Sequence, residues 1–136
     1  MLKFLSTLIV GVFLATSVGA SSDVSPTEIT GAKTVSASEA KALFDEGVIF
    51  IDVRKDSDWE AGRIPDAVHI ELKKVYSPDT LGAEVPKGEK VVFYCNGEKC
   101  KRSSKASAKA VEWGYTNVYY FRDGFPAWKA AGYSVE

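Results

Sequence analysis

Runs of four mostly apolar residues recur along this chain, and they constrain its fold more than any other feature. They span residues 48–51, 67–70, 91–94 and 118–121. A continuous apolar run of this length is typical of a strand buried on both faces of a sheet. Between or after these runs lie segments with the pattern of helices, at residues 37–44, 56–61, 102–113 and 126–131. Strands that alternate with helices predict an α/β fold, with a mostly parallel sheet flanked by helices. Residues 77–89, which hold two prolines and two glycines, are expected to be mostly loop.

The first twenty residues have the layout of a secretory signal peptide. Lys3 is their only charge, an apolar stretch follows at residues 8–14, and small residues lead up to Ala20. Cleavage is expected after Ala20, which places the mature protein in the periplasm or outside the cell. A retained membrane anchor is the alternative, but the apolar stretch is short for a spanning helix of about 20 residues.

The rest of the chain divides into a polar stretch and one domain. Residues 21–30 are expected to be a linker, and residues 31–136 a single domain. Removal of residues 1–20 takes away Lys3, so the formal net charge changes from −1 to −2. This balance does not favour nucleic acid or an anionic membrane surface as a partner. We therefore expect no nucleic-acid partner and, after cleavage, no membrane association.

Both cysteines lie in one short loop, although a domain of this size buries a core that needs no disulfide. Cys95 follows the apolar run 91–94, at the carboxyl end of a predicted strand, where the sites of parallel sheets lie. Cys100 follows it, and a helix is predicted from residue 102. Loop amides, the helix dipole and nearby cations are expected to favour a thiolate and to attract a small anion. The cations are Lys99, Lys101 and Arg102.

Other interpretations of the two cysteines stay open at this point. A structural disulfide fits both the short spacing and an oxidising compartment. A pair of inert buried thiols is another, although Lys99 and Lys101 on either side of Cys100 argue that it is exposed. A zinc site is poorly supported, because His69 is the only histidine and no third ligand is evident. No metal or other cofactor is therefore expected.

Three segments, in order, resemble the signatures of the rhodanese-like sulfurtransferase domain. The first is FIDVRKDSDWEAGRIPDAVHI (50–70), the second is the strand, cysteine and helix unit (91–106), and the third is DGFPAWKAAGYSVE (123–136). The positions that match the first and third signatures are Asp52, Val53, Arg54, Gly62, Ile64, Pro65, Ala67, Gly124, Trp128 and Gly132. The resemblance covers residues 31–136, the whole predicted domain.

The resemblance implies a three-layer α/β fold with a five-stranded parallel sheet, and a catalytic cysteine at Cys95. Cys95 would take a sulfane sulfur from an anionic donor such as thiosulfate, become a persulfide, and pass the sulfur to cyanide, a small thiol or a protein thiol partner. Asp52 and Arg54 are expected to form a buried structural pair near the base of the loop. The loop would bind the donor through backbone N–H groups and positive charge. Its residues are Asn96, Gly97, Glu98, Lys99, Cys100, Lys101 and Arg102.

The chain departs from the family pattern in this loop. Arg102 lies seven positions after Cys95, so the loop is longer than is usual in the family and closer to that of phosphatase relatives. A phosphatase- or arsenate-reductase-like enzyme is therefore one alternative, although those phosphatases place a histidine where this chain has Tyr94. A non-catalytic binding module or thiol-redox module is another. Cys100 has no counterpart in the minimal motif. It could resolve the persulfide and release sulfide, or lock the loop as a disulfide.

Overall fold

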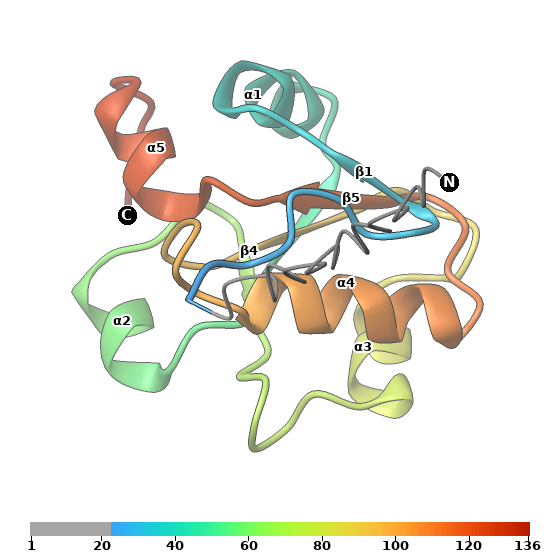
Figure 1. Cartoon of the computed structure of the whole chain (residues 1–136). Helices are drawn as coiled ribbons and strands as arrows, with labels where there is room; N and C mark the ends of the chain where they lie inside the picture. The colour runs from blue at the N-terminus through green and yellow to red at the C-terminus, as the bar shows by residue number, and fades with distance from the viewer. Residues whose placement is uncertain (1–22) are drawn as a thin grey trace, which may run out of the picture.

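The computed structural model describes residues 23–136, so the predicted signal peptide lies outside the described residues. Within them, five strands form one sheet with the order β1-β5-β4-β2-β3, and every neighbouring pair is parallel (Figure 1). The strands are β1 (Ala32–Thr34), β2 (Ile49–Asp52), β3 (Val68–His69), β4 (Val91–Tyr94) and β5 (Val118–Phe121). The prediction of an α/β fold with a five-stranded parallel sheet is confirmed.

The described residues form five helices, and four of them cover the two faces of the sheet. They are α1 (Ala37–Asp45), α2 (Asp56–Ala61), α3 (Pro78–Glu84), α4 (Arg102–Glu112) and α5 (Gly124–Ala130). Figure 1 shows α1 and α5 on one side of the sheet, and α3 and α4 on the other. This arrangement is the three-layer fold that the resemblance implies.

The core divides into two clusters, because successive side chains of a strand point to opposite faces. In β4, Val91 and Phe93 lie in the cluster under α3 and α4, whereas Val92 and Tyr94 lie in the cluster under α1 and α5. All four side chains of β4 are fully buried. The prediction from the sequence that 91–94 forms a strand buried on both faces is confirmed.

The prediction that residues 77–89 are mostly loop is wrong, because α3 begins inside this segment. The Ser77 hydroxyl accepts a hydrogen bond from the Thr80 amide at 3.1 Å, and the Thr80 hydroxyl accepts one from the Ser77 amide at 2.9 Å. Pro78 occupies the first turn, where its missing N–H costs nothing. The helix buries Leu81 completely, and Val85 directly after it, in the core under α4. Proline and serine here therefore start a helix.

Smaller differences concern the ends of elements. The edge strand β1 has no apolar run and pairs only with β5, so the residue pattern alone did not reveal it. Strand β2 extends to Asp52, one residue beyond the apolar run, and α5 begins at Gly124, two residues before the predicted start. Across residues 23–136, the structure contains no helix with the length and apolar character needed to span a membrane.

Candidate active site

Cys95 lies directly after β4, the middle strand of the sheet, and starts the loop that leads to α4. Strands β2 and β5 flank β4, so this carboxyl-terminal edge is also formed by Asp52 and Phe121, which pair with Tyr94. Only 1% of the Cys95 surface is exposed. The sequence placed Cys95 at this edge, and the structure agrees.

A disulfide joins Cys95 to Cys100, with the two Cα atoms 6.2 Å apart. The loop doubles back because the Cys100 amide donates to the Gly97 carbonyl at 3.0 Å, and Gly97 has a φ of 111° that favours glycine. Cys100 is half-buried, whereas the flanking lysines suggested that it would be exposed. The possibility of two inert free thiols therefore does not describe this structure.

The backbone of Cys95 is held from the side of α5. The Phe125 amide donates to the Cys95 carbonyl oxygen at 2.8 Å. Gly124 makes this approach possible, because a Cβ atom at that position would lie 2.3 Å from the same oxygen. Its φ of 64° also lies in the left-handed region. The glycine of the third sequence signature therefore fixes the position of the cysteine.

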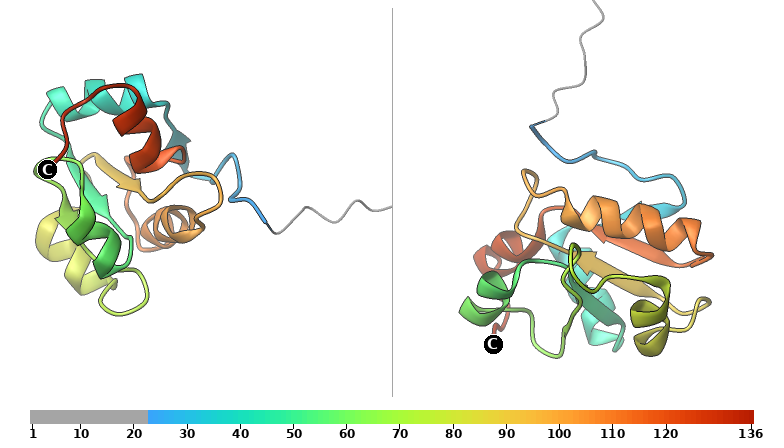
Figure 2. Two further views of the ribbon diagram at one scale, coloured as in Figure 1. Left: turned by 90° about the vertical axis from the view of Figure 1, so that its left-hand side faces the viewer. Right: turned by 90° about the horizontal axis from the view of Figure 1, so that it is seen from below.

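The segment before β1 holds the tip of the loop. The Ser25 amide and hydroxyl both donate to the Glu98 carbonyl, at 2.6 and 2.8 Å, and Ser25 is buried. Arg122 donates to the Ser25 carbonyl at 3.0 Å, and the Tyr120 hydroxyl donates to the Pro26 carbonyl at 2.9 Å. In Figure 2 this segment, drawn in blue, runs alongside α4. We call residues 25–27 the N-terminal strap; they lie in the stretch that the sequence suggested was a linker.

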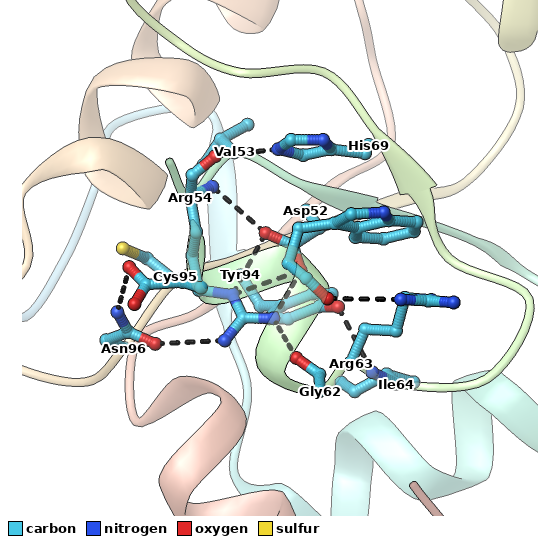
Figure 3. Close-up of polar contacts among 12 residues, drawn as sticks. Asp52, Val53, Arg54, Gly62, Arg63, Ile64, His69, Tyr94, Cys95 and Asn96 are labelled. Carbon is cyan, nitrogen blue, oxygen red and sulfur yellow. Dashed lines mark hydrogen bonds and ion pairs between the residues drawn. The ribbon is translucent and has the colours of Figure 1, made fainter. Parts of the chain in front are cut away.

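The predicted Asp52–Arg54 pair is present and buried below the loop (Figure 3). Arg54 Nη2 donates to Asp52 Oδ2 at 2.7 Å and to the Gly62 carbonyl at 2.6 Å. Burial alone would lower the pKa of Arg54, but the hydrogen bond and charge of Asp52 raise it overall. Arg54 Nη1 also donates to Asn96 Oδ1 at 3.2 Å, and Asn96 Nδ2 donates to Asp58 Oδ2 at 2.9 Å. The pair therefore positions the first loop residue after Cys95.

Tyr94 lies where the related phosphatases carry a histidine, and its side chain does not replace one. It is fully buried in the core, its hydroxyl accepts from the Ile64 amide at 3.2 Å, and Arg54 lies over its ring. Burial, and secondarily the charge of Asp52, raises the pKa of Tyr94 above its ordinary value. The phenol therefore stays neutral and serves the packing below the loop.

Arg102, which was predicted to bind the donor, forms an ion pair that the sequence did not suggest. Its Nη1 donates to Glu71 Oε1 and, at 3.3 Å, to the Val53 carbonyl. Burial would raise the pKa of Glu71, but hydrogen bonds from Arg102 and from the Lys73 amide lower it overall. The charge of Arg102 is thus matched by a buried carboxylate. Glu71 directly follows the apolar run 67–70. This position near the end of a strand was the signal in the sequence that could have identified Glu71 as part of the site.

The remaining loop groups are suited to an anion. Within residues 23–136, the amides of Asn96, Gly97, Glu98 and Lys99 donate to no protein acceptor. The side chains of Lys99 and Lys101 form no ion pair there. Glu98 is exposed, and its carboxylate lies 3.7 Å from Arg122. These four amides and two ammonium groups are therefore available to bind an anion in the loop.

No set of three or more metal-ligating side chains lies together in the described part of the chain. His69 is instead part of the packing around Arg54. Its Nε2 lies 2.8 Å from the Arg54 carbonyl oxygen, and its ring stacks on Trp59 with centroids 4.8 Å apart. His69 therefore contributes to the packing around Arg54.

The sequence of this chain matches a known family of domains and several known proteins. A family model of the rhodanese-like domain matches residues 36–131. The thiosulfate sulfurtransferase GlpE of Pseudomonas savastanoi pv. phaseolicola is 29% identical over 102 residues, a match that covers 75% of this chain and 92% of that protein.

Two further relatives carry other descriptions. The tRNA uridine(34) hydroxylase of Cytophaga hutchinsonii is 36% identical over 110 residues, a match that covers 74% of this chain. It covers only 32% of the hydroxylase, so the chain spans about a third of that protein. A solved structure from Rhodopseudomonas palustris, described as a possible tyrosine phosphatase, has a TM-score of 0.63 and 28% identity, and the match covers 79% of this chain and 86% of that one.

Proposed function

Because the chain belongs to the rhodanese-like domain family, we propose that it is a sulfurtransferase that works through a persulfide on Cys95. A small anionic donor of the thiosulfate type supplies the sulfane sulfur, and cyanide, a small thiol or a protein thiol accepts it. One observation carries the proposal: Cys95 lies at the carboxyl end of the middle strand, at the start of a loop whose first four amides, from Asn96 to Lys99, donate to no protein acceptor within residues 23–136.

The reaction begins from the reduced protein, because the disulfide leaves no thiolate. The Cys95 thiolate attacks the outer sulfur of thiosulfate, an S–S bond forms at Cys95, and sulfite leaves with the electron pair of the broken bond. The persulfide anion then lies among the free loop amides and near Lys99 and Lys101, which stabilise its charge. A thiolate or cyanide that attacks the outer sulfur of the persulfide completes the transfer.

The same geometry weighs against the phosphatase alternative. Arginine in an active-site loop can bind a phosphate dianion through two parallel hydrogen bonds, whereas Arg102 already pairs with Glu71. Tyr94 is a buried neutral phenol and does not supply the function of a histidine.

Mass spectrometry of the Cys100→Ser variant tests the proposal directly, because this variant has only one thiol. We expect the reduced variant to gain one sulfur atom after incubation with thiosulfate, and to release one sulfite. The double variant Cys95→Ser/Cys100→Ser is the matched control and gains nothing. A Cys100→Ser protein that gains no sulfur and releases no sulfite would overturn the proposal, as would hydrolysis of an aryl phosphate that depends on Cys95.

We also propose that the protein acts outside the cytosol. The support is the layout of residues 1–20, together with two cysteines that form a disulfide suited to an oxidising compartment. Amino-terminal sequencing of the protein from its native host is expected to start after Ala20. A mature protein that begins at Met1 would contradict export by a cleaved signal.

A further inference from the structure

We propose that Cys100 is a second catalytic cysteine, which attacks the Cys95 persulfide, releases sulfide and forms the disulfide seen in the structure. This inference rests on the proposed function, since the persulfide must form first. It adds a reaction: a sulfane sulfur is reduced to sulfide within the protein, and a dithiol reductant outside it supplies the electrons.

The first step of the argument is distance. The two Cα atoms are 6.2 Å apart, and the two Sγ atoms are already bonded in this backbone conformation. A persulfide on Cys95 keeps its inner sulfur at the Sγ position, so the Cys100 sulfur reaches that atom without a change of fold. The bond in the structure joins the two Sγ atoms, and therefore corresponds to attack on the inner sulfur, with the outer sulfur as leaving group.

The second step concerns how firmly each cysteine is held. Cys95 is held by β4 and by the Phe125 amide, and Gly124 packs against its carbonyl group. Cys100 lies outside any strand or helix, and its amide is held by a single hydrogen bond to Gly97. Cys95 is thus held by more contacts than Cys100. Two successive attacks require this arrangement, with one sulfur fixed to receive the donor and a second, less constrained thiol beside it.

The third step is exposure. Cys95 is 1% exposed, whereas Cys100 is half-buried and lies between Lys99 and Lys101. Positive charge beside a thiol favours the thiolate, which is the attacking form. An external acceptor has to enter the loop to reach a persulfide on Cys95. The Cys100 thiol, in contrast, already lies beside Cys95 within the loop. In the disulfide, Cys100 is the more exposed of the two residues, and an external thiolate is expected to attack its sulfur first.

The atoms and electrons of the cycle balance. Thiosulfate and the Cys95 thiolate give the persulfide and sulfite. The Cys100 thiol loses its proton, its sulfur bonds to Cys95 Sγ, and the bond from Sγ to the outer sulfur breaks to release hydrosulfide. The two protein thiols are oxidised by two electrons, and the sulfane sulfur is reduced by two. A dithiol, free or in a protein, then reduces the disulfide and becomes a disulfide itself.

A single-turnover experiment separates this inference from the proposed function. The full chain, its Cys100→Ser variant and its Cys95→Ser variant are reduced, freed of reductant, and mixed with one equivalent of thiosulfate without oxygen. Sulfite reports the first step, sulfide the second, and intact mass gives the state of the protein. The native chain is expected to release both and to lose two hydrogen atoms. Cys100→Ser is expected to release sulfite only and to keep the sulfur, and Cys95→Ser to release neither.

Each result leads to a distinct conclusion. A native chain that keeps the added sulfur, with Cys100 still open to alkylation, would overturn the role of Cys100 and leave the proposed function intact. Sulfide release from Cys100→Ser at a rate within tenfold of the native rate would also overturn it. The absence of sulfite from both the native chain and Cys100→Ser would remove the proposed function and the inference together.

Discussion

Ser25 donates two hydrogen bonds to the carbonyl oxygen of Glu98, across 73 positions of the sequence. The donors are the backbone amide and the hydroxyl of one buried residue, and the acceptor is the tip of the loop that carries both cysteines. The described chain therefore contacts its active-site loop from an irregular segment that precedes the first strand.

Replacement of Ser25 by alanine is expected to loosen this contact. The variant loses the hydroxyl bond and keeps the amide bond, so we expect a loss of about 1 kcal/mol in the free energy of unfolding. Thiosulfate:cyanide activity should fall as well, since Glu98 lies in the loop. Urea denaturation measures the first effect. The control is Ser57→Ala on α2, whose exposed side chain forms no hydrogen bond within residues 23–136; equal effects of the two changes would contradict the role of the strap.

Replacement of Gly124 by alanine should be far more damaging than replacement of Gly132. Both glycines have positive φ, at 64° and 80°, so alanine costs roughly 1–2 kcal/mol at either position. Only at Gly124 does the new Cβ collide with the Cys95 carbonyl, and we expect about 1–3 kcal/mol more there. A Cβ atom added at Gly132 would meet no atom within 4 Å apart from its chain neighbours. Chemical denaturation of both variants measures the difference, and similar losses would show that the close approach is unimportant.

The Glu71–Arg102 pair predicts how stability depends on pH. The pKa of Glu71 is lowered in the folded protein below the ordinary value of 4.5. Its carboxylate therefore stabilises the fold fully above about pH 4.5, and this contribution is lost as the pH falls through the folded pKa. We expect Glu71→Gln to be less stable than the native chain at pH 7, by about 1–2 kcal/mol, with the gap closing in acid.

Denaturation midpoints of both proteins, measured between pH 3 and pH 7, would check this. The lower limit lies roughly one and a half units below the ordinary pKa of glutamate, and the upper limit lies well above it. The matched control is Glu60→Gln, because Glu60 is exposed on α2 and forms no ion pair in the described part of the chain. If the curves of the native chain and Glu71→Gln run parallel down to the lowest pH, the buried pair does not control the acid response.

Oxidation should stop sulfur transfer in the native chain and leave the Cys100→Ser variant active. Formation of the Cys95–Cys100 disulfide removes the attacking thiolate, and a dithiol reductant restores it. Thiocyanate production from thiosulfate and cyanide, measured before and after mild oxidation, gives the readout. Full activity of the oxidised native chain would mean that the disulfide does not block the nucleophile.

The sequence predicted the features of this protein that depend on local patterns. The apolar runs at 48–51, 91–94 and 118–121 correspond to β2, β4 and β5, because strands of a parallel sheet that is covered on both faces consist of continuous apolar residues. The place of Cys95 followed from the strand before it and the helix after it. In contrast, α3 was missed because proline and glycine signal a loop, whereas here the serine cap and the burial of Leu81 override them.

The contacts that determine the charge and position of the loop were not predictable in this way. Arg102 was expected to face the donor, but it pairs with Glu71, which lies 31 positions away. The Ser25–Glu98 contact spans an even longer interval, and its polar segment has no periodic pattern. Such pairs form only after the sheet order brings distant segments to one edge. A pattern within a window of residues therefore cannot reveal them.

The order of the strands determines which backbone amides are protected from hydrogen exchange. Amide hydrogens of β4 are shielded by a neighbouring strand on either side, so their exchange with solvent should require an opening close to global unfolding. Loop amides that have no protein acceptor should exchange in small, frequent openings. Each oxidation and reduction of the cysteines should then change exchange rates between Asn96 and Lys101 while those of β4 stay constant. A disulfide at the edge of the sheet would thus form and break without exposing the core to solvent.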